Sequence, residues 1–288
     1  MPKTSFFHPG VIFALASAIG LGAITTQAKF VFADGGNAMT LMFMRFAIAP
    51  IIFGSCIVIL RKPLGIPKVH RLPTLLLGII WSATMIFYMT SVETISVSLA
   101  VLILYAYPLI VLGVSIITRQ LSPSLMLSFL FASAFAGLYL ALSGSEIQID
   151  GQGLLLAGLA SLGAAYTFIS GAKVASQFDP LVLTFWINLT GLAMILPLLP
   201  GQFQLPQTMT GALALGLATL FYIVAILCQF QALARLKAAT AAFVLNLEPV
   251  VSILLAGLLL NEQLLGAQWL GVGLVIASIA FLSLLKKG

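Results

Sequence analysis

The sequence predicts an all-α integral membrane protein with ten transmembrane helices, arranged as two inverted five-helix repeats. Three observations lead to this prediction: the composition, ten long apolar runs, and an internal repeat. Of the 288 residues, 61% are hydrophobic and 7% are charged, and the mean hydropathy is +1.17. A soluble domain carries about 25% charged residues, so this chain lacks the charge to cover a soluble surface.

The apolar runs have the length of membrane spans, since a transmembrane helix needs about 20 predominantly apolar residues. Turn-forming residues separate the runs, among them Asp34-Gly35-Gly36-Asn37 and Asp179-Pro180. The longest break, 61–71, has no room for a soluble domain. The first run is too long for the apolar region of a cleaved signal peptide. The predicted spans cover roughly residues 10–32, 39–60, 72–92, 97–117, 124–144, 152–173, 180–200, 209–234, 238–260 and 266–285.

The basic residues predict the orientation, because cytoplasmic loops are enriched in Lys and Arg. With both termini in the cytoplasm, no outer loop carries a basic residue, and acidic residues such as Asp34 and Asp150 face outward with Glu93, Glu146 and Glu262. We therefore expect a multi-pass protein of the inner (plasma) membrane. On the cytoplasmic side stand 11 of the 13 basic residues: Lys3, Arg61, Lys62, Lys68, Arg71, Arg119, Lys173, Arg235, Lys237, Lys286 and Lys287.

Several function classes fit the sequence poorly. The net charge of +6 does not indicate nucleic-acid binding, because the basic residues stand at helix ends. Cys56 and Cys228 lie in apolar runs and are expected to be free thiols, with no metal-ligand spacing. A membrane-embedded enzyme or receptor is disfavoured, because His8 and His70 are expected to lie in loops and the acids are scattered. We expect neither enzymatic activity nor a cofactor.

The chain repeats itself weakly. Leu15-Ala16-Ser17 recurs 144 residues later as Leu159-Ala160-Ser161. We expect repeats at 1–148 and 149–288. Because five helices are an odd number, the second repeat enters the membrane upside down, as in secondary transporters whose solute site lies near the midplane. Chance similarity is the alternative, and the matched prolines disfavour it. At an offset of 141 the matched pairs are Trp81 with Tyr222, Tyr88 with Gln229, Ala100 with Ala241, and Pro108 with Pro249.

A family resemblance rests on motifs of the second half: Ala241-Ala242-Phe243, Leu247-Glu248-Pro249-Val250, Asn261-Glu262-Gln263-Leu264 and Gln268-Trp269-Leu270-Gly271. This half resembles the EamA half of the drug/metabolite transporter superfamily. The resemblance covers the whole chain and implies a ten-helix, inverted-repeat exporter of small metabolites, often amino acids.

The first half matches this pattern more loosely. Ala100, Pro108 and Gly137 fit it, and Arg45 matches the basic residue near the start of its second helix. Two positions depart from the pattern. Leu121 stands where a helix-ending acid is expected, with Arg119 nearby, and Tyr107 stands where the second half has Glu248.

Glu248 is the strongest single candidate for a proton or cation site. It stands near the middle of the apolar run 238–260, where a carboxylate costs roughly 3 kcal/mol on insertion scales. The adjacent Pro249 removes a backbone donor, so a helix irregularity is expected there. The alternative is a carboxyl group that is neutralised by a proton or a cation and only locks two helices together.

The residues expected to line a substrate site are aromatic and neutral polar side chains on several spans. Trp81, Thr84, Tyr88 and Ser91 share one helical face, and Tyr222 and Gln229 occupy the equivalent face of the second half. We expect the two faces to meet, although core packing explains an aromatic stripe equally well. The remaining candidates are Tyr107, Tyr166 and Ser252, with Arg45 and Lys29 as possible charge partners.

The alternatives for the two cations concern the membrane interface. Lys29 stands at the outer end of its span, where snorkelling to the interface is the simpler role. Arg45 stands deeper and is expected to pair with a carboxyl group, to bond helix-end carbonyls or to snorkel outward. A pairing of Arg45 with Glu248 would keep the carboxyl group ionised and weaken a proton-site role.

Two function hypotheses follow. The first is export of a small metabolite, most simply an amino acid, by alternating access with possible proton coupling. The second is multidrug efflux of lipophilic cations. The expected partners are the solute and the lipid bilayer. Small residues on the fifth and tenth spans predict close packing, either within the chain or in a homodimer: Ser133, Gly137, Ala141, Ala267 and Gly271.

Overall fold

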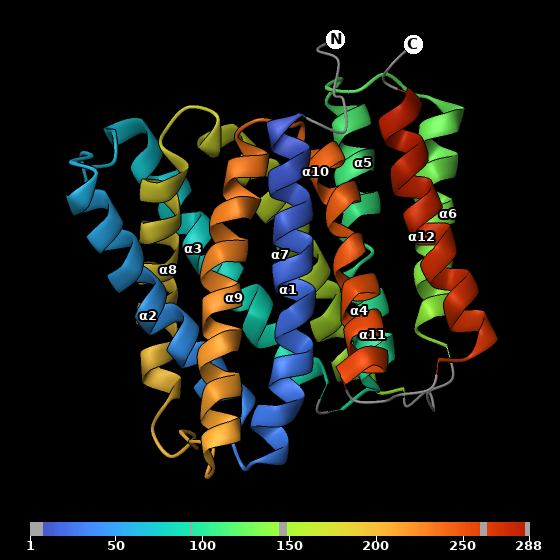
Figure 1. The fold of residues 1–288 in the computed structure, drawn as a ribbon. Coiled ribbons are helices and arrows are strands. Elements are labelled where there is room, and N and C mark those ends of the chain that lie inside the picture. The colour runs from blue at the N-terminus through green and yellow to red at the C-terminus, as the bar shows by residue number, and fades with distance from the viewer. Residues whose placement is uncertain (1–7, 93, 144–148, 260–263, 286–288) are drawn as a thin grey trace.

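The computed structural model describes residues 8–92, 94–143, 149–259 and 264–285, and all regular elements within these ranges are helices (Figure 1). Predictions on Lys3, Glu93, Glu146, Asn261, Glu262, Gln263, Lys286 and Lys287 fall outside the described residues. The helices are α1 (Pro9–Ala33), α2 (Ala38–Ile59), α3 (Lys68–Ser91), α4 (Val97–Leu104), α5 (Tyr107–Ile117), α6 (Leu125–Ala141), α7 (Gly151–Ala175), α8 (Pro180–Ile195), the 3-10 turn η1 (Leu196–Leu198), α9 (Met209–Leu233), α10 (Ala238–Leu245), α11 (Leu247–Leu259) and α12 (Gly266–Leu285).

The helices agree with the predicted membrane spans. Within the described part of the chain, eight helical segments are long and apolar enough to cross a bilayer, with α4–α5 counted as one segment and α10–α11 as another. Two shorter apolar helices, Leu125–Ala141 and Gly266–Leu282, stand at the remaining predicted spans. The chain is therefore a multi-pass membrane protein.

Side-chain caps begin several helices at the predicted breaks. The side-chain amide oxygen of Asn37 accepts a hydrogen bond from the Thr40 N–H at 2.8 Å. A carboxylate oxygen of Asp150 accepts one from the Gly153 N–H at 3.0 Å. Such caps satisfy backbone donors that have no partner within the helix. At the turn between α1 and α2, Gly35 has φ +86°, a conformation that favours glycine.

Two spans are broken at equivalent positions of the repeat. The break between α4 and α5 precedes Pro108, and the break between α10 and α11 precedes Pro249. Because proline has no N–H, the carbonyl groups four residues earlier, on Leu104 and Leu245, lose their usual helical donors. Such backbone irregularity at membrane depth is tolerated where it is buried in protein or lines a cavity.

The two halves pack against each other through reciprocal contacts. Helix α1 packs along α9, and α7, its counterpart in the second half, packs along α3. Helix α2 packs against α8, and α6 against α12. In Figure 1 the start of α1 and the end of α12 lie at the same end of the bundle, and α6 and α12 form one edge of it. The largest fully buried side chains include Phe53, Phe131, Phe230 and Phe243.

The small-residue ridges of α6 and α12 face each other within the chain. A β-carbon on Gly137 would lie 2.9 Å from the Gly271 carbonyl oxygen. The Ser278 and Ser133 hydroxyl oxygens are 3.2 Å apart across the same contact. The ridges thus allow two helix backbones to approach closely. A homodimer stays a prediction that this intramolecular packing does not test.

We predict that Gly271→Ala destabilises the protein by about 1–3 kcal/mol, the usual cost of overpacking. The new β-carbon would collide with the backbone of Gly137 and Ala141, which cannot move as a flexible side chain can. Gly273→Ala is the matched control, because a β-carbon there meets no atom within 4 Å. Thermal unfolding in detergent measures both variants. Equal unfolding midpoints for the two would contradict this packing.

Candidate functional site

Glu248 lies in the first turn of α11, directly after the helix break, and is partly buried. Three tyrosines interact with its carboxyl group. The Tyr105 side chain hydrogen bonds to it, and Tyr88 and Tyr107 interact with it electrostatically. The tyrosines come from α3, from the α4–α5 break and from α5. The carboxyl group of the second half is therefore faced by phenol groups of the first half.

Helix α1 also reaches the backbone at Glu248. A β-carbon on Gly22 would lie 2.6 Å from the Glu248 carbonyl oxygen and 2.8 Å from Cβ of Val251. A larger residue at position 22 would push α1 away from α11. Close packing against α1 therefore helps to hold the helix segment that carries the carboxyl group.

Arg45, on α2, interacts electrostatically with both Glu248 and Tyr222. Its guanidinium carbon lies 5.6 Å from the centroid of the Tyr222 ring. Its Nε atom is buried and has no hydrogen-bond partner. Among the ion pairs of the described residues, none within 4.0 Å joins Arg45 to Glu248. The two groups therefore influence each other without direct contact.

A chain of hydrogen bonds joins three spans beside Arg45. The Trp81 indole Nε1 donates to the Tyr222 hydroxyl oxygen at 3.3 Å, and the Tyr222 hydroxyl donates to Oδ1 of Asn188 at 2.8 Å. All three side chains are buried. Trp81 and Tyr222 are the pair matched by the 141-residue offset, so the structure brings these two equivalent positions of α3 and α9 into contact. The Phe46 ring packs edge-on against Tyr222.

The two hydroxyl groups predicted on the same face of α3 take other positions. The Thr84 hydroxyl donates to the Ile80 carbonyl at 2.7 Å, and its oxygen packs against Gly163 of α7. The Ser91 hydroxyl donates to the Tyr88 carbonyl at 2.7 Å. Both groups are satisfied within their own helix, so Trp81 and Tyr88 are the members of this stripe that join the polar cluster. A binding role for Thr84 and Ser91 stays a prediction.

The other predicted residues are more dispersed. Gln229 is buried and its Nε2 atom has no hydrogen-bond partner. Tyr166 is partly buried against the apolar core, and the Ser252 hydroxyl pairs with that of Thr25 on α1. Lys29 is exposed near the end of α1. We find these four side chains in different surroundings from one another.

Tyr107 was a predicted site residue, whereas Tyr105 was not singled out from the sequence, and the helix break lies between them. Regular helical geometry does not extend across positions 105 and 106, so both rings lie near Glu248, with centroids 5.9 Å apart. Asn246 stands at the equivalent break, and its buried Oδ1 atom has no hydrogen-bond partner. The matched prolines were the available signal for both breaks.

These features together define a class of protein: a two-repeat helical membrane protein with a polar cluster at mid-span, built from both halves. The EamA-like transporter family model matches the chain twice, at residues 8–143 and 151–284. The chain therefore belongs to the EamA-like transporter family of the drug/metabolite transporter superfamily.

Solved structures support the same fold. The fold matches 29 chains of solved structures. One of them, titled "Crystal structure of protein", has a TM-score of 0.83 at 15% sequence identity. The match covers 96% of this chain and 97% of the other. At this identity the likeness concerns the fold alone. No curated protein matches the sequence.

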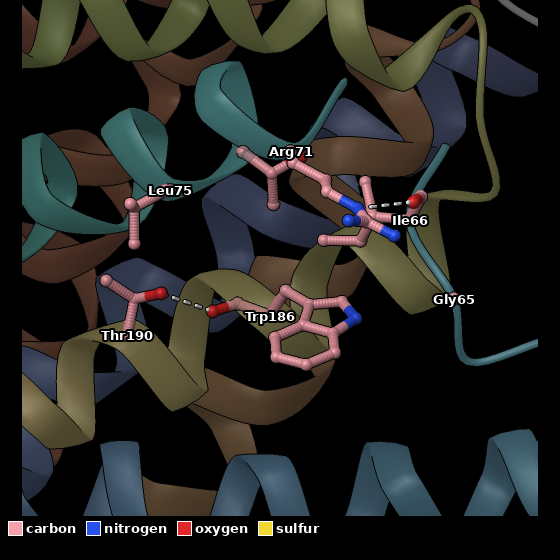
Figure 2. Close-up of a pocket in the computed structure, with 7 residues that line it drawn as sticks. Gly65, Ile66, Arg71, Leu75, Trp186 and Thr190 are labelled. Atoms are coloured by element: carbon pink, nitrogen blue, oxygen red, sulfur yellow. Dashed lines mark hydrogen bonds between the residues drawn. The ribbon is translucent and has the colours of Figure 1, made fainter. Parts of the chain in front are cut away.

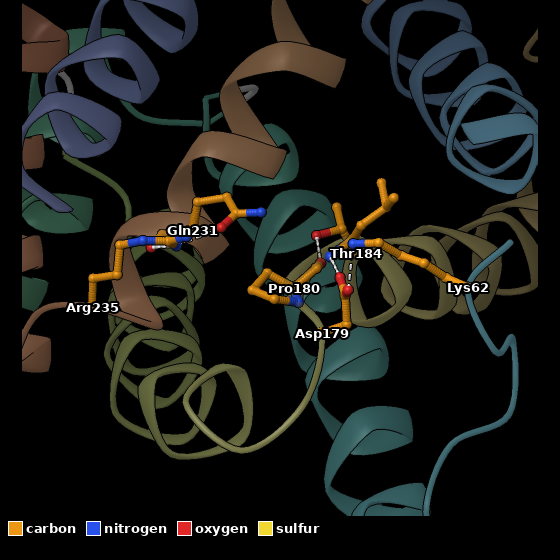
Figure 3. A network of polar contacts seen from close by, with 7 residues as sticks. Lys62, Asp179, Pro180, Thr184, Gln231 and Arg235 are labelled. Atoms are coloured by element: carbon orange, nitrogen blue, oxygen red, sulfur yellow. Dashed lines mark hydrogen bonds and ion pairs between the residues drawn. The ribbon is translucent and has the colours of Figure 1, made fainter. Parts of the chain in front are cut away.

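The two halves are also joined at the membrane end where α1 begins. The Lys62 ammonium group lies 2.5 Å from Oδ2 of Asp179, and Oδ1 of Asp179 accepts from the Leu181 N–H at 2.9 Å (Figure 3). Partial burial alone would raise the pKa of Asp179, but the hydrogen bonds from Lys62 and Leu181 outweigh it and lower the pKa below its ordinary value of 3.8. Lys62 precedes α3, whereas Asp179 caps α8.

We predict that Tyr222→Phe lowers stability by about 1–3 kcal/mol, because it leaves Asn188 Oδ1 without its donor and the Trp81 indole N–H without its acceptor. Tyr139→Phe is the control, since the Tyr139 side chain on α6 is 57% exposed. Thermal unfolding of both purified variants tests the difference. A Tyr222→Phe midpoint as high as that of the control would show that the buried hydrogen bonds contribute nothing.

We predict that Asp179→Asn lowers thermal stability at pH 7, and that the loss shrinks as the pH falls below 3.8. A depressed native-state pKa stabilises the fold above the unfolded-state pKa, and this stabilisation disappears as the carboxylate becomes protonated. Asp150→Asn is the matched control, because Asp150 also caps a helix through a backbone N–H. A deficit of Asp179→Asn that is independent of pH would contradict a role for the ion pair.

Proposed function

We propose that the chain is a secondary transporter that exports a small metabolite, with amino acids as the favoured substrate class. The observation that carries this proposal is the polar cluster at mid-span. It contains Glu248 from the second half, Arg45 from the first half, and aromatic residues between them. Charged residues inside membrane spans are costly and commonly mark solute or ion pathways.

The cluster offers complementary groups to a small zwitterion. A guanidinium group binds a carboxylate well, and a carboxylate binds an ammonium group. Within the cluster, Arg45 Nε is buried and lacks a hydrogen-bond partner in the protein. Buried polar atoms are normally hydrogen bonded, so a bound solute or water would satisfy it. A phosphorylated solute would favour several cations over this single guanidinium.

Alternating access is the mechanism that the repeat favours. We infer an inverted arrangement of the halves, because each contains five spans and the first helix of each packs along the third helix of the other. Transporters of this architecture move one bundle against the other around a central site. The helix breaks before Pro108 and Pro249 lie in the segments that carry Tyr107 and Glu248, so both halves have irregular backbone beside the cluster.

We further propose that the protein lies in the inner (plasma) membrane and that both of its termini face the cytoplasm. Arg61, Lys62, Lys68 and Arg71 gather at the membrane end where α1 begins. The enrichment of basic residues on cytoplasmic loops supports this orientation. Solute export then carries the substrate from that end toward the end where α1 meets α2.

Efflux of lipophilic cations is the second candidate. The tyrosines around Glu248 favour it, because aromatic rings and a carboxylate together attract organic cations. The Arg45 guanidinium disfavours it, since a cationic solute would meet a like charge in the same cluster. Comparison of a cationic dye with amino acids in one efflux assay separates the two candidates.

We predict that Glu248→Gln abolishes the dependence of efflux on a pH gradient while the protein remains folded. The amide cannot carry a proton or attract an ammonium group. Proteoliposomes loaded with a labelled amino-acid mixture measure the efflux, with and without an imposed gradient. Asp150→Asn serves as the control, because this acid lies at a helix start outside the cluster.

Two outcomes would contradict the proposal in different ways. Undiminished, gradient-dependent efflux from Glu248→Gln would exclude the carboxyl group from proton coupling. Efflux of the dye without any amino acid from the wild-type protein would replace amino-acid export with multidrug efflux.

A further inference from the structure

A pocket of about 340 Å³ lies between the start of α3 and α8, apart from the Glu248 cluster (Figure 2). It opens on the outside of the bundle, where Leu64, Leu72 and Leu75 are exposed. In a membrane protein, such an apolar surface faces lipid. The residues that line the pocket are Gly65, Ile66, Arg71, Thr74, Leu75, Trp186 and Thr190.

The pocket has a polar end and an apolar end. In Figure 2, Arg71, Ile66 and Trp186 lie at one end, and Leu75 and Thr190 at the other. Arg71 Nε donates to the Ile66 carbonyl at 3.3 Å, and Trp186 Nε1 donates to the Leu64 carbonyl at 3.0 Å. These bonds hold the guanidinium and the indole in place at the membrane boundary. Tryptophan is typical of this depth.

The charges around the pocket favour an anionic ligand. None of its lining residues is acidic. Arg61 and Lys68 are exposed on the same connection, and Asp179 nearby is already paired with Lys62. Thr74 lines the pocket, is 1% exposed, and its hydroxyl oxygen has no hydrogen-bond partner. A guanidinium and a hydroxyl group together suit a phosphate group.

We propose that this pocket binds an anionic phospholipid, with the headgroup phosphate at Arg71 and an acyl chain along Leu75 toward the bilayer interior. Leu75 is one helical turn beyond Arg71 on α3, so the apolar end lies deeper in the membrane than the charged end. Basic pockets between transmembrane helices are known to hold anionic headgroups. The bound lipid would contact α3 of the first half and α8 of the second. This site does not depend on the proposed transport function.

Native mass spectrometry of the delipidated full-length protein tests the proposal. Phosphatidylglycerol is titrated against phosphatidylcholine with the same acyl chains, and sn-glycerol 3-phosphate serves as a headgroup without chains. We expect Arg71→Ala to weaken phosphatidylglycerol binding about five-fold, the share of one basic residue. Arg71→Lys should retain most of the affinity, and phosphatidylcholine binding should change little in either variant.

Two further variants keep the result specific. Lys173→Ala removes an exposed cation in the last turn of α7, at the same membrane end but outside the pocket, and should leave the affinity unchanged. Leu75→Trp fills the apolar end and should weaken the binding of both lipids at this site. Equal losses for Arg71→Ala and Lys173→Ala, or no loss for either, would overturn the proposal. Competition by sn-glycerol 3-phosphate as strong as by the lipid would also overturn it, in favour of a soluble phosphate ligand.

Discussion

The presence of two charged side chains, Glu248 and Arg45, within the membrane spans is the constraint on which the centre of the molecule depends. Each group alone would cost several kcal/mol inside a membrane span. Here one half of the chain supplies the carboxyl group and the other half the guanidinium group. The two groups interact electrostatically although no ion pair among the described residues joins them, so both halves contribute to the polar cluster at mid-span. Phenol groups from Tyr88, Tyr105 and Tyr222 surround the two charges and give them further polar neighbours.

The helix breaks explain how an apolar bundle accommodates this cluster. A continuous helix satisfies its own backbone and presents side chains at fixed angles. The breaks before Pro108 and Pro249 interrupt this pattern in equivalent spans, and Tyr105 and Asn246 occupy the broken positions. Close packing of Gly22 on the backbone at Glu248 keeps one of these segments in place. The same proline that disrupts a helix thereby helps to position the polar groups.

Much of this arrangement could be predicted from the sequence, because apolar length and repeat offsets are properties of the chain itself. In the described part of the chain, eight apolar runs became helical segments long enough to span a bilayer and two became shorter helices, and the 141-residue offset paired Trp81 with Tyr222. Contacts that depend on departures from regular helices could not be predicted in this way. Helical spacing did not single out Tyr105, which hydrogen bonds to Glu248, and it gave no sign that Thr84 and Ser91 would bond to their own backbone. The lipid-facing pocket depends on the backbone path of residues 64–67, a connection between helices that has no helical periodicity to predict it.

The most direct test of the electrostatic interaction between Arg45 and Glu248 is a double-mutant cycle of Arg45→Gln and Glu248→Gln. The free energy of unfolding in mixed detergent micelles is measured for the wild type, both single variants and the double variant. We expect a coupling of at least about 0.5 kcal/mol, with the double variant losing less than the sum of the single losses. Strictly additive losses would contradict the pairing, because they would mean that the two charges do not act on each other across the halves.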